Sequence, residues 1–328
     1  MKRERARRAG VAARFAFAAA VIACILWRKI DPGELAVRLR GIDPRLFAAC
    51  GLGYGLLFVF SAFRWQALVF VHGIRVRYGS LLRFCLIGAF FNNVMPGSMG
   101  GDILKAWYCA KVDRSRQEAA VGSVFADRIV GFLSLFAIGF FGLAVNLGAP
   151  GLRQASQIFV AHFLAICLGL AFLSRRDLLA KLPFARRILD RGTLGDHLRR
   201  LYDSLQIYRA RPRAVARALG ISCLMQLVFI VVLLGIARSL GMRGVAYRHL
   251  LLLMPLIGTI AAVPVTPSGW GTMEWAFVYF FPALGVTAEQ ALALDLATRA
   301  LTISWGLVGG VLYAVPPRQT AGCTASLN

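Results

Sequence analysis

A run of apolar residues is interrupted at FFNNVMPGSMGGDILKAW, residues 90–107, by two asparagines, a proline, three glycines and an acid. Glycine and proline are poor residues for a helix interior, so one continuous membrane helix is not expected here. The apolar piece before the break, 84–95, is shorter than the roughly 20 residues that cross a bilayer. The stretch therefore predicts a re-entrant hairpin, two short helices joined by a break inside the membrane.

The composition is that of an integral membrane protein. Of the 328 residues 58% are hydrophobic and 16% are charged, and the mean hydropathy is +0.66. The apolar runs are continuous, which favours helices over the alternating strands of a barrel. The full spans are expected at about 11–27, 46–70, 119–147, 156–174, 216–237 and 289–315, and the pieces too short to span are 84–95, 250–265 and 273–284.

Basic residues collect between these runs. The formal net charge is +23, and this pattern indicates topology signals and contacts with anionic lipids, with no nucleic-acid partner. The segment 175–217 carries twelve basic residues against four acids and is expected to be a cytoplasmic loop. Both flanks of residues 90–107 are basic, so the hairpin is expected to open to the cytoplasm, as are the N- and C-termini. One apolar stripe in the loop predicts a helix on the membrane surface or packed on the protein's inner face, through Leu194, Leu198, Leu201, Leu205 and Tyr208.

The N-terminal residues also have the basic flank and apolar core of a signal peptide. Arg28 and Lys29 follow this core where a cleavage site would carry small residues, so a retained first span is favoured. The seven cysteines contain no CxxC pair and the four histidines are dispersed, so neither a metal nor another cofactor is expected. No GxxxxGK[ST] phosphate loop occurs either.

The interruption has a second copy downstream. PGSMGGD begins at Pro96 and PSGWGTME begins at Pro267, and each is P-x-x-x-G followed shortly by an acid. Arg128 follows Pro96 by 32 residues, and Arg299 follows Pro267 by the same 32 residues, each early in a long apolar run. We expect two repeat units, 80–147 and 248–315, each a hairpin and a full span. Their hairpins open to opposite faces, which makes the repeat inverted.

The broken hairpins have the chemistry of an anion site. The half-helices are expected to begin near Ser98 and Ser268, where free N–H groups and the helix dipole favour phosphate. Arginine can bind two phosphate oxygens at once. Ionisable residues in a membrane are functional candidates, although the acids can instead pair with the arginines or cap half-helices, as Asp295 can pair with Arg299 four residues on. The candidate substrate-binding residues are Asn92, Asn93, Pro96, Gly97, Ser98, Gly100, Gly101, Asp102, Asp127, Arg128, Pro267, Gly269, Gly271, Glu274 and Arg299.

Three features carry a resemblance to a known family, and they are NNVMPGSMGGD, the later Asp127-Arg128 pair and PVTPSGWGTME. The chain resembles the transmembrane region of lysylphosphatidylglycerol synthases and its stand-alone relatives. The resemblance covers roughly residues 10–316 and implies a flippase-like module of the inner (plasma) membrane. The second motif departs from the family's usual PGGLG. Only residues 317–328 remain as a tail beyond the single domain 1–316, so neither a lysyl-transferase nor a glycosyltransferase domain is expected, and no catalytic residue is assigned.

Three functions follow as hypotheses. The first is a lipid flippase that holds an anionic phospholipid or polyprenyl-phosphate-linked head group between the two hairpins at the membrane midplane. The second is a membrane partner of a separately encoded glycosyltransferase or other lipid-modifying enzyme, docked on residues 175–217. The third, an enzyme of lipid synthesis, is disfavoured because no nucleophile–base pair or metal cluster is visible. The sequence does not specify an oligomeric state.

Overall fold

The computed structural model describes residues 31–95, 100–174, 206–262, 266 and 269–315. Within these ranges the chain is helical and contains no strand, as expected for an all-α protein. The expected first span at 11–27, the tail 317–328 and all of the apolar stripe except Tyr208 lie outside the described residues.

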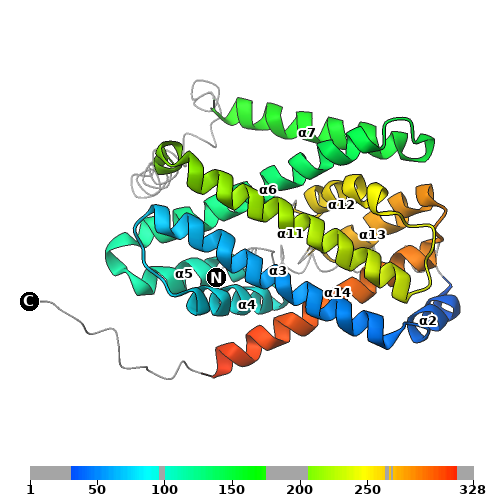
Figure 1. Cartoon of the computed structure of the whole chain (residues 1–328), viewed down its shortest axis with the longest axis horizontal. Helices are drawn as coiled ribbons and strands as arrows, with labels where there is room; N and C mark the ends of the chain where they lie inside the picture. Colours follow the sequence, from blue (N-terminus) through cyan, green and yellow to red (C-terminus); the bar gives the residue numbers. More distant parts are fainter. Residues whose placement is uncertain (1–30, 96–99, 175–205, 263–265, 267–268, 316–328) are drawn as a thin grey trace, which may run out of the picture.

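The α-helices carry the labels of Figure 1. They are α2 (Pro32–Arg40), α3 (Pro44–Val71), α4 (Tyr78–Val94), α5 (Gly100–Val112), α6 (Gln117–Val145), α7 (Arg153–Ser174), α11 (Pro212–Ser239), α12 (Tyr247–Ala261), α13 (Thr272–Phe280) and α14 (Ala288–Ala314). Short 3-10 turns lie at η1 (Arg114–Arg116), η2 (Pro150–Leu152), η3 (Ile207–Ala210) and η5 (Phe281–Leu284).

Four of the described helices, α3, α6, α11 and α14, are long and apolar enough to cross a membrane. They confirm the spans expected at 46–70, 119–147, 216–237 and 289–315. Helix α7 has 22 residues and covers the expected span 156–174, but it does not belong to this group of four. Large apolar side chains point outward from the bundle, as lipid contact requires, and on α3 Leu52 is 74% exposed.

Local sequence fixes where the long helices begin. Pro44 opens α3 at a position where its missing N–H costs nothing, and Asp43 before it accepts the Arg45 N–H at 2.9 Å. Helix α14 begins with a capping box in which Thr287 and Gln290 accept each other's backbone N–H. These caps satisfy N–H groups that a helix start leaves without partners.

The two interrupted segments form pairs of short helices. Helices α4 and α5 have 17 and 13 residues, about 26 and 20 Å at 1.5 Å per residue, and α12 and α13 have 15 and 9, about 23 and 14 Å. Each is shorter than the roughly 30 Å hydrocarbon core of a bilayer. Figure 1 shows the α4–α5 pair and the α12–α13 pair toward opposite ends of the long helices.

The second half-helix begins later than the sequence predicted. Helix α13 starts at Thr272, four residues after the predicted start near Ser268. Gly269 and Gly271 have φ of 73° and 83°, which a right-handed helix does not contain. The glycines therefore form the break itself, and the helix follows it. The first half-helix is described from Gly100, two residues after its predicted start near Ser98, and residues 96–99 lie outside the described part.

Short helices of one expected unit pack on the long helix of the other. Helix α4 packs on α14, and α12 packs on α6. Both contacts bring backbones together at a glycine: a Cβ on Gly309 would overlap the Leu86 carbonyl, and a Cβ on Gly142 would overlap the Leu251 carbonyl. Small residues permit such close approach between membrane helices. This packing brings described residues beside the two breaks, Asn92 and Asn93 of one and Gly269 and Trp270 of the other, into one region.

Candidate functional site

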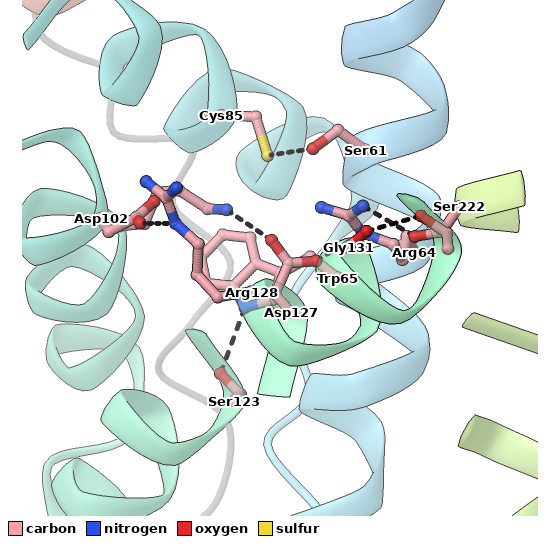
Figure 2. Close-up of polar contacts among 12 residues, drawn as sticks. Ser61, Arg64, Trp65, Cys85, Asp102, Ser123, Asp127, Arg128, Gly131 and Ser222 are labelled. Carbon is pink, nitrogen blue, oxygen red and sulfur yellow. Dashed lines mark hydrogen bonds and ion pairs between the residues drawn. The ribbon is translucent and has the colours of Figure 1, made fainter. Parts of the chain in front are cut away.

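The first polar cluster surrounds Asp127, a buried carboxylate on α6. Its Oδ1 accepts a hydrogen bond from Arg64 Nε of α3 at 2.7 Å, as Figure 2 shows, and its Oδ2 accepts one from Lys105 Nζ of α5 at 3.0 Å. The side chains of Asp127, Arg64 and Lys105 are only 6%, 13% and 8% exposed. Lys105 also lies over the ring of Trp65, 4.7 Å from its centroid. One carboxylate thus holds two cations and ties three helices together.

A second ion pair joins the two helices that follow the first break. Arg128 Nε of α6 donates to Asp102 Oδ2 of α5 (Figure 2). Asp102 lies in the first turn of α5, where a carboxylate also complements the positive end of the helix. The Arg128 side chain is 41% exposed, so this pair is far more accessible than the cluster around Asp127.

The second motif forms a matching cluster around Arg299 of α14. Its Nη2 lies 2.9 Å from Glu274 Oε1, and its Nε lies 3.8 Å from Asp295 Oδ2. Glu274 Oε2 accepts the Gly271 N–H at 2.6 Å, which caps α13. The guanidinium carbon lies 4.0 Å from the centroid of the Trp270 ring. Glu274 thus takes both roles that the sequence left open for the acids, pairing with an arginine and capping a half-helix, whereas Asp295 reaches Arg299 only at 3.8 Å.

Residues of both expected repeat units line a cavity of about 350 Å³, called here the midplane cavity after the site expected between the two hairpins. The first unit contributes Arg128 and two asparagines, and the second contributes Arg299 with the residues of its break. Asn93 reaches across and donates to the Thr302 carbonyl of α14 at 3.3 Å. The lining residues include Asn92, Asn93, Arg128, Gly269, Trp270, Asp295, Arg299 and Thr302.

An apolar groove of about 400 Å³ runs between α5 and α6 and is called here the α5–α6 groove. Asp102 and Arg128 line it at one end, and Ala110 and Gln117 are also among its lining residues. Its walls are otherwise apolar, through Ile103, Ala106, Trp107, Val121, Val124 and Phe125. Arg128 lines both this groove and the midplane cavity, so a charged side chain stands where an apolar surface meets a polar one.

The structure separates the predicted site residues into groups. Asn92, Asn93, Arg128, Gly269 and Arg299 line the midplane cavity. The remaining described candidates have other contacts. Asp102 and Glu274 pair with the two arginines, and Asp127 is enclosed by Arg64 and Lys105. Gly100 begins α5, Gly271 directly precedes α13, and the Gly101 N–H donates to Asn92 Oδ1. The predicted residues Pro96, Gly97, Ser98 and Pro267 lie outside the described part of the chain.

Two of the predicted anion-site glycines face protein. A Cβ on Gly101 would overlap the Gly88 carbonyl of α4, and a Cβ on Gly100 would meet the Met95 side chain at 2.6 Å. Their lack of a side chain is therefore used for packing between α4 and α5. In the described ranges no group of three or more His, Cys, Asp or Glu side chains is placed to hold a metal ion.

Sequence reasoning missed Arg64 and Lys105. Arg64 lies inside the apolar span expected at 46–70, so the rule that selected Arg128 as an ionisable residue within a membrane also applies to it. Lys105 lies within the quoted stretch 90–107 and received no role in a site, but it is buried against Asp127. Arg64 Nη1 also donates to Ser222 Oγ of α11 at 2.8 Å. The two residues are 158 positions apart in the sequence, so no local pattern could predict this contact.

Four apolar helices that can span a membrane, with buried ion pairs joining α3 to α6 and α13 to α14, define a multi-pass integral membrane protein. A family model described as the lysylphosphatidylglycerol synthase TM region matches residues 11–310. The chain belongs to this family.

The chain is similar to UPF0104 membrane proteins and to a protein named as a glycosyltransferase. The UPF0104 membrane protein MJ1595 of Methanocaldococcus jannaschii is 24% identical over 268 residues, 75% of this chain and 77% of the relative. PH1989 of Pyrococcus horikoshii is 26% identical over 316 residues, 89% of this chain and 93% of the relative. The glycosyltransferase AglD of Haloferax volcanii is 25% identical over 322 residues, 86% of this chain but 50% of AglD.

Proposed function

We propose that this protein binds an anionic lipid in the midplane cavity and moves it between leaflets. The observation that carries the proposal is the convergence of Arg128 and Arg299, one from each expected repeat unit, on a single cavity of about 350 Å³. A guanidinium offers five N–H donors in a fork that matches a phosphodiester, and the paired carboxylates hold both forks in position. The head group belongs to a phospholipid or to a polyprenyl-phosphate-linked sugar.

The α5–α6 groove favours a lipid over a water-soluble anion. A hydrocarbon chain that leaves the head group at Arg128 meets an apolar surface at once, since Arg128 lines both spaces. Burial of such a chain contributes about 0.8 kcal/mol for each CH₂ group. A soluble anion gains nothing from this groove.

Transport between leaflets calls for two states with the site open to opposite faces. The reciprocal packing of α4 on α14 and of α12 on α6 supports an inverted repeat, as does the separation of the two hairpins in Figure 1. Rocking of such repeats around a midplane site is a common mechanism of alternating access. The proposal includes an inner-membrane location with both termini in the cytoplasm.

The test uses purified protein in vesicles that contain labelled phosphatidylglycerol or labelled polyprenyl phosphate. We expect leaflet exchange of at least one of these lipids, and a loss of binding with Arg128→Gln plus Arg299→Gln. Charge-assisted hydrogen bonds contribute about 1.5–3 kcal/mol each, so the double change is expected to weaken binding by at least roughly 100-fold. Arg38→Gln, which breaks an exposed pair with Glu34, serves as the control. Absence of binding and exchange for both lipids would refute the proposal.

A second candidate function is support for a separate transferase. AglD carries the name of a glycosyltransferase, and this chain aligns with half of its length. In this hypothesis the cavity presents a lipid acceptor to a transferase docked on residues 175–217. Co-purification that requires this segment, with no leaflet exchange by the protein alone, would favour it.

A further inference from the structure

The cluster around Arg299 contains one positive charge and two carboxylates. Asp295, Glu274 and Arg299 have side-chain exposures of 2%, 3% and 12%. Asp295 Oδ2 lies 3.8 Å from Arg299 Nε, too far for a hydrogen bond, and this buried oxygen accepts none from the described residues. Glu274 holds Arg299 at 2.9 Å, so the Asp295 carboxylate is left without a close positive partner. A second ionised carboxylate is costly at such a site.

The other groups around Asp295 do not supply the missing charge. Tyr54 of α3 faces the same cavity and bonds Thr302 Oγ1 at 2.8 Å. Arg128 of α6 also lines the cavity, but Asp102 pairs with it. The residues of α4 that line the cavity beside this cluster are Asn92 and Asn93, and neither titrates. Three carboxylates thus face two arginines at the place where the proposed ligand brings a further negative charge.

We propose that Asp295 is a proton-binding site, and that binding of an anionic head group in the midplane cavity is coupled to protonation of Asp295. The inference rests on the proposed function and deepens it. A proton taken from bulk water neutralises the surplus carboxylate and leaves Glu274 and Arg299 as a balanced pair. The Asp295 hydroxyl then donates a hydrogen bond where the carboxylate only accepts. Because coupling is reciprocal, a proton that strengthens lipid binding is itself held more tightly when lipid is bound.

The coupling also indicates a source of energy. If the proton enters with the lipid from one side of the membrane and leaves with it on the other, a proton gradient drives the lipid in that direction. The chain needs no nucleotide for this step. Vesicles with an imposed proton gradient are expected to accumulate labelled phosphatidylglycerol in one leaflet, and vesicles without a gradient are expected only to equilibrate it.

The decisive experiment titrates short-chain phosphatidylglycerol into the full-length purified protein between pH 5 and pH 8. Its phosphodiester stays charged over this range. We expect affinity to rise at least about fivefold as pH falls, and calorimetry in buffers of different ionisation enthalpy to report uptake of about one proton per lipid. Asp295→Asn is expected to bind with no pH dependence and no proton uptake. Glu34→Gln, an exposed carboxylate outside the site, is the matched control and keeps the wild-type behaviour.

Each result decides between the claims. Binding with the same pH dependence and proton uptake in Asp295→Asn overturns the proton site and leaves the proposed function standing. Absence of phosphatidylglycerol binding at every pH overturns the coupling for this lipid, and absence of polyprenyl phosphate binding as well overturns the proposed function. If Asp295→Asn does not fold, proton uptake by the wild-type protein and the carbonyl infrared band of a protonated buried carboxyl still decide the question. The coupling is refuted if the wild-type protein shows neither proton uptake nor the infrared band. It is also refuted if both signals persist unchanged after the lipid is released.

Discussion

Replacement of Asp127 by asparagine tests whether the first cluster stabilises the fold. The Asp127 carboxylate is the shared partner of Arg64 and Lys105, at 2.7 and 3.0 Å, and the three side chains are at most 13% exposed. Asparagine keeps the shape but removes the charge, so two buried cations lose their compensation. Removing one partner of a buried ion pair costs about 3–5 kcal/mol, and the expected loss in free energy of unfolding lies in that range.

Unfolding of the purified protein in mixed micelles with increasing denaturing detergent measures this loss. Glu34→Gln is the control, since its pair with Arg38 is 36–42% exposed and is expected to contribute at most about 1 kcal/mol. Adding Lys105→Met to Asp127→Asn removes one uncompensated cation, so the double variant is expected to be more stable than the sum of the two single effects predicts. A cost for Asp127→Asn no larger than that of Glu34→Gln would contradict the reasoning.

Three further predictions concern packing, pH and the groove. Gly101→Ala forces a Cβ into the α4 backbone and should lower the free energy of unfolding by about 1–3 kcal/mol, whereas Gly79→Ala, with open space around it, should not lower it. Burial and then Arg116 lower the pKa of His72, just beyond α3, so the unfolded chain binds more protons and stability should fall as pH drops below about 6.5. His72→Gln should make that slope shallower, and an unchanged slope would contradict the prediction. Ala110→Trp in the α5–α6 groove should weaken binding of long-chain phosphatidylglycerol more than of its short-chain form, and Ala161→Trp, in a groove on α7, should not.

The sequence predicted the long helices well because length and hydropathy are local properties. The spans expected at 46–70 and 216–237 are the helices Pro44–Val71 and Pro212–Ser239 in the structure. The start of α13 was misplaced because it depends on a positive φ at Gly269 and Gly271. The sequence does not show which glycines adopt a positive φ. Ion pairs between residues far apart in the sequence could not be predicted either. Arg64 and Asp127, for example, are separated by 63 residues and meet only because α3 packs on α6. The proximity of Asp295 to Arg299 was predictable because both lie on one helix face, but the 3.8 Å separation of their charged atoms was not.

The packing of α4 on α14 has a consequence for how the protein is made. The ribosome releases α4 and its asparagines long before α14 exists, yet Asn93 finds its partner at Thr302 and Arg83 finds a partner at the Leu312 carbonyl. Until those last residues emerge, the polar groups of the first hairpin have to be sheltered by water, by lipid head groups or by the insertion machinery. Messages truncated before residue 302 are therefore expected to yield inserted but unfinished chains that membrane proteases degrade.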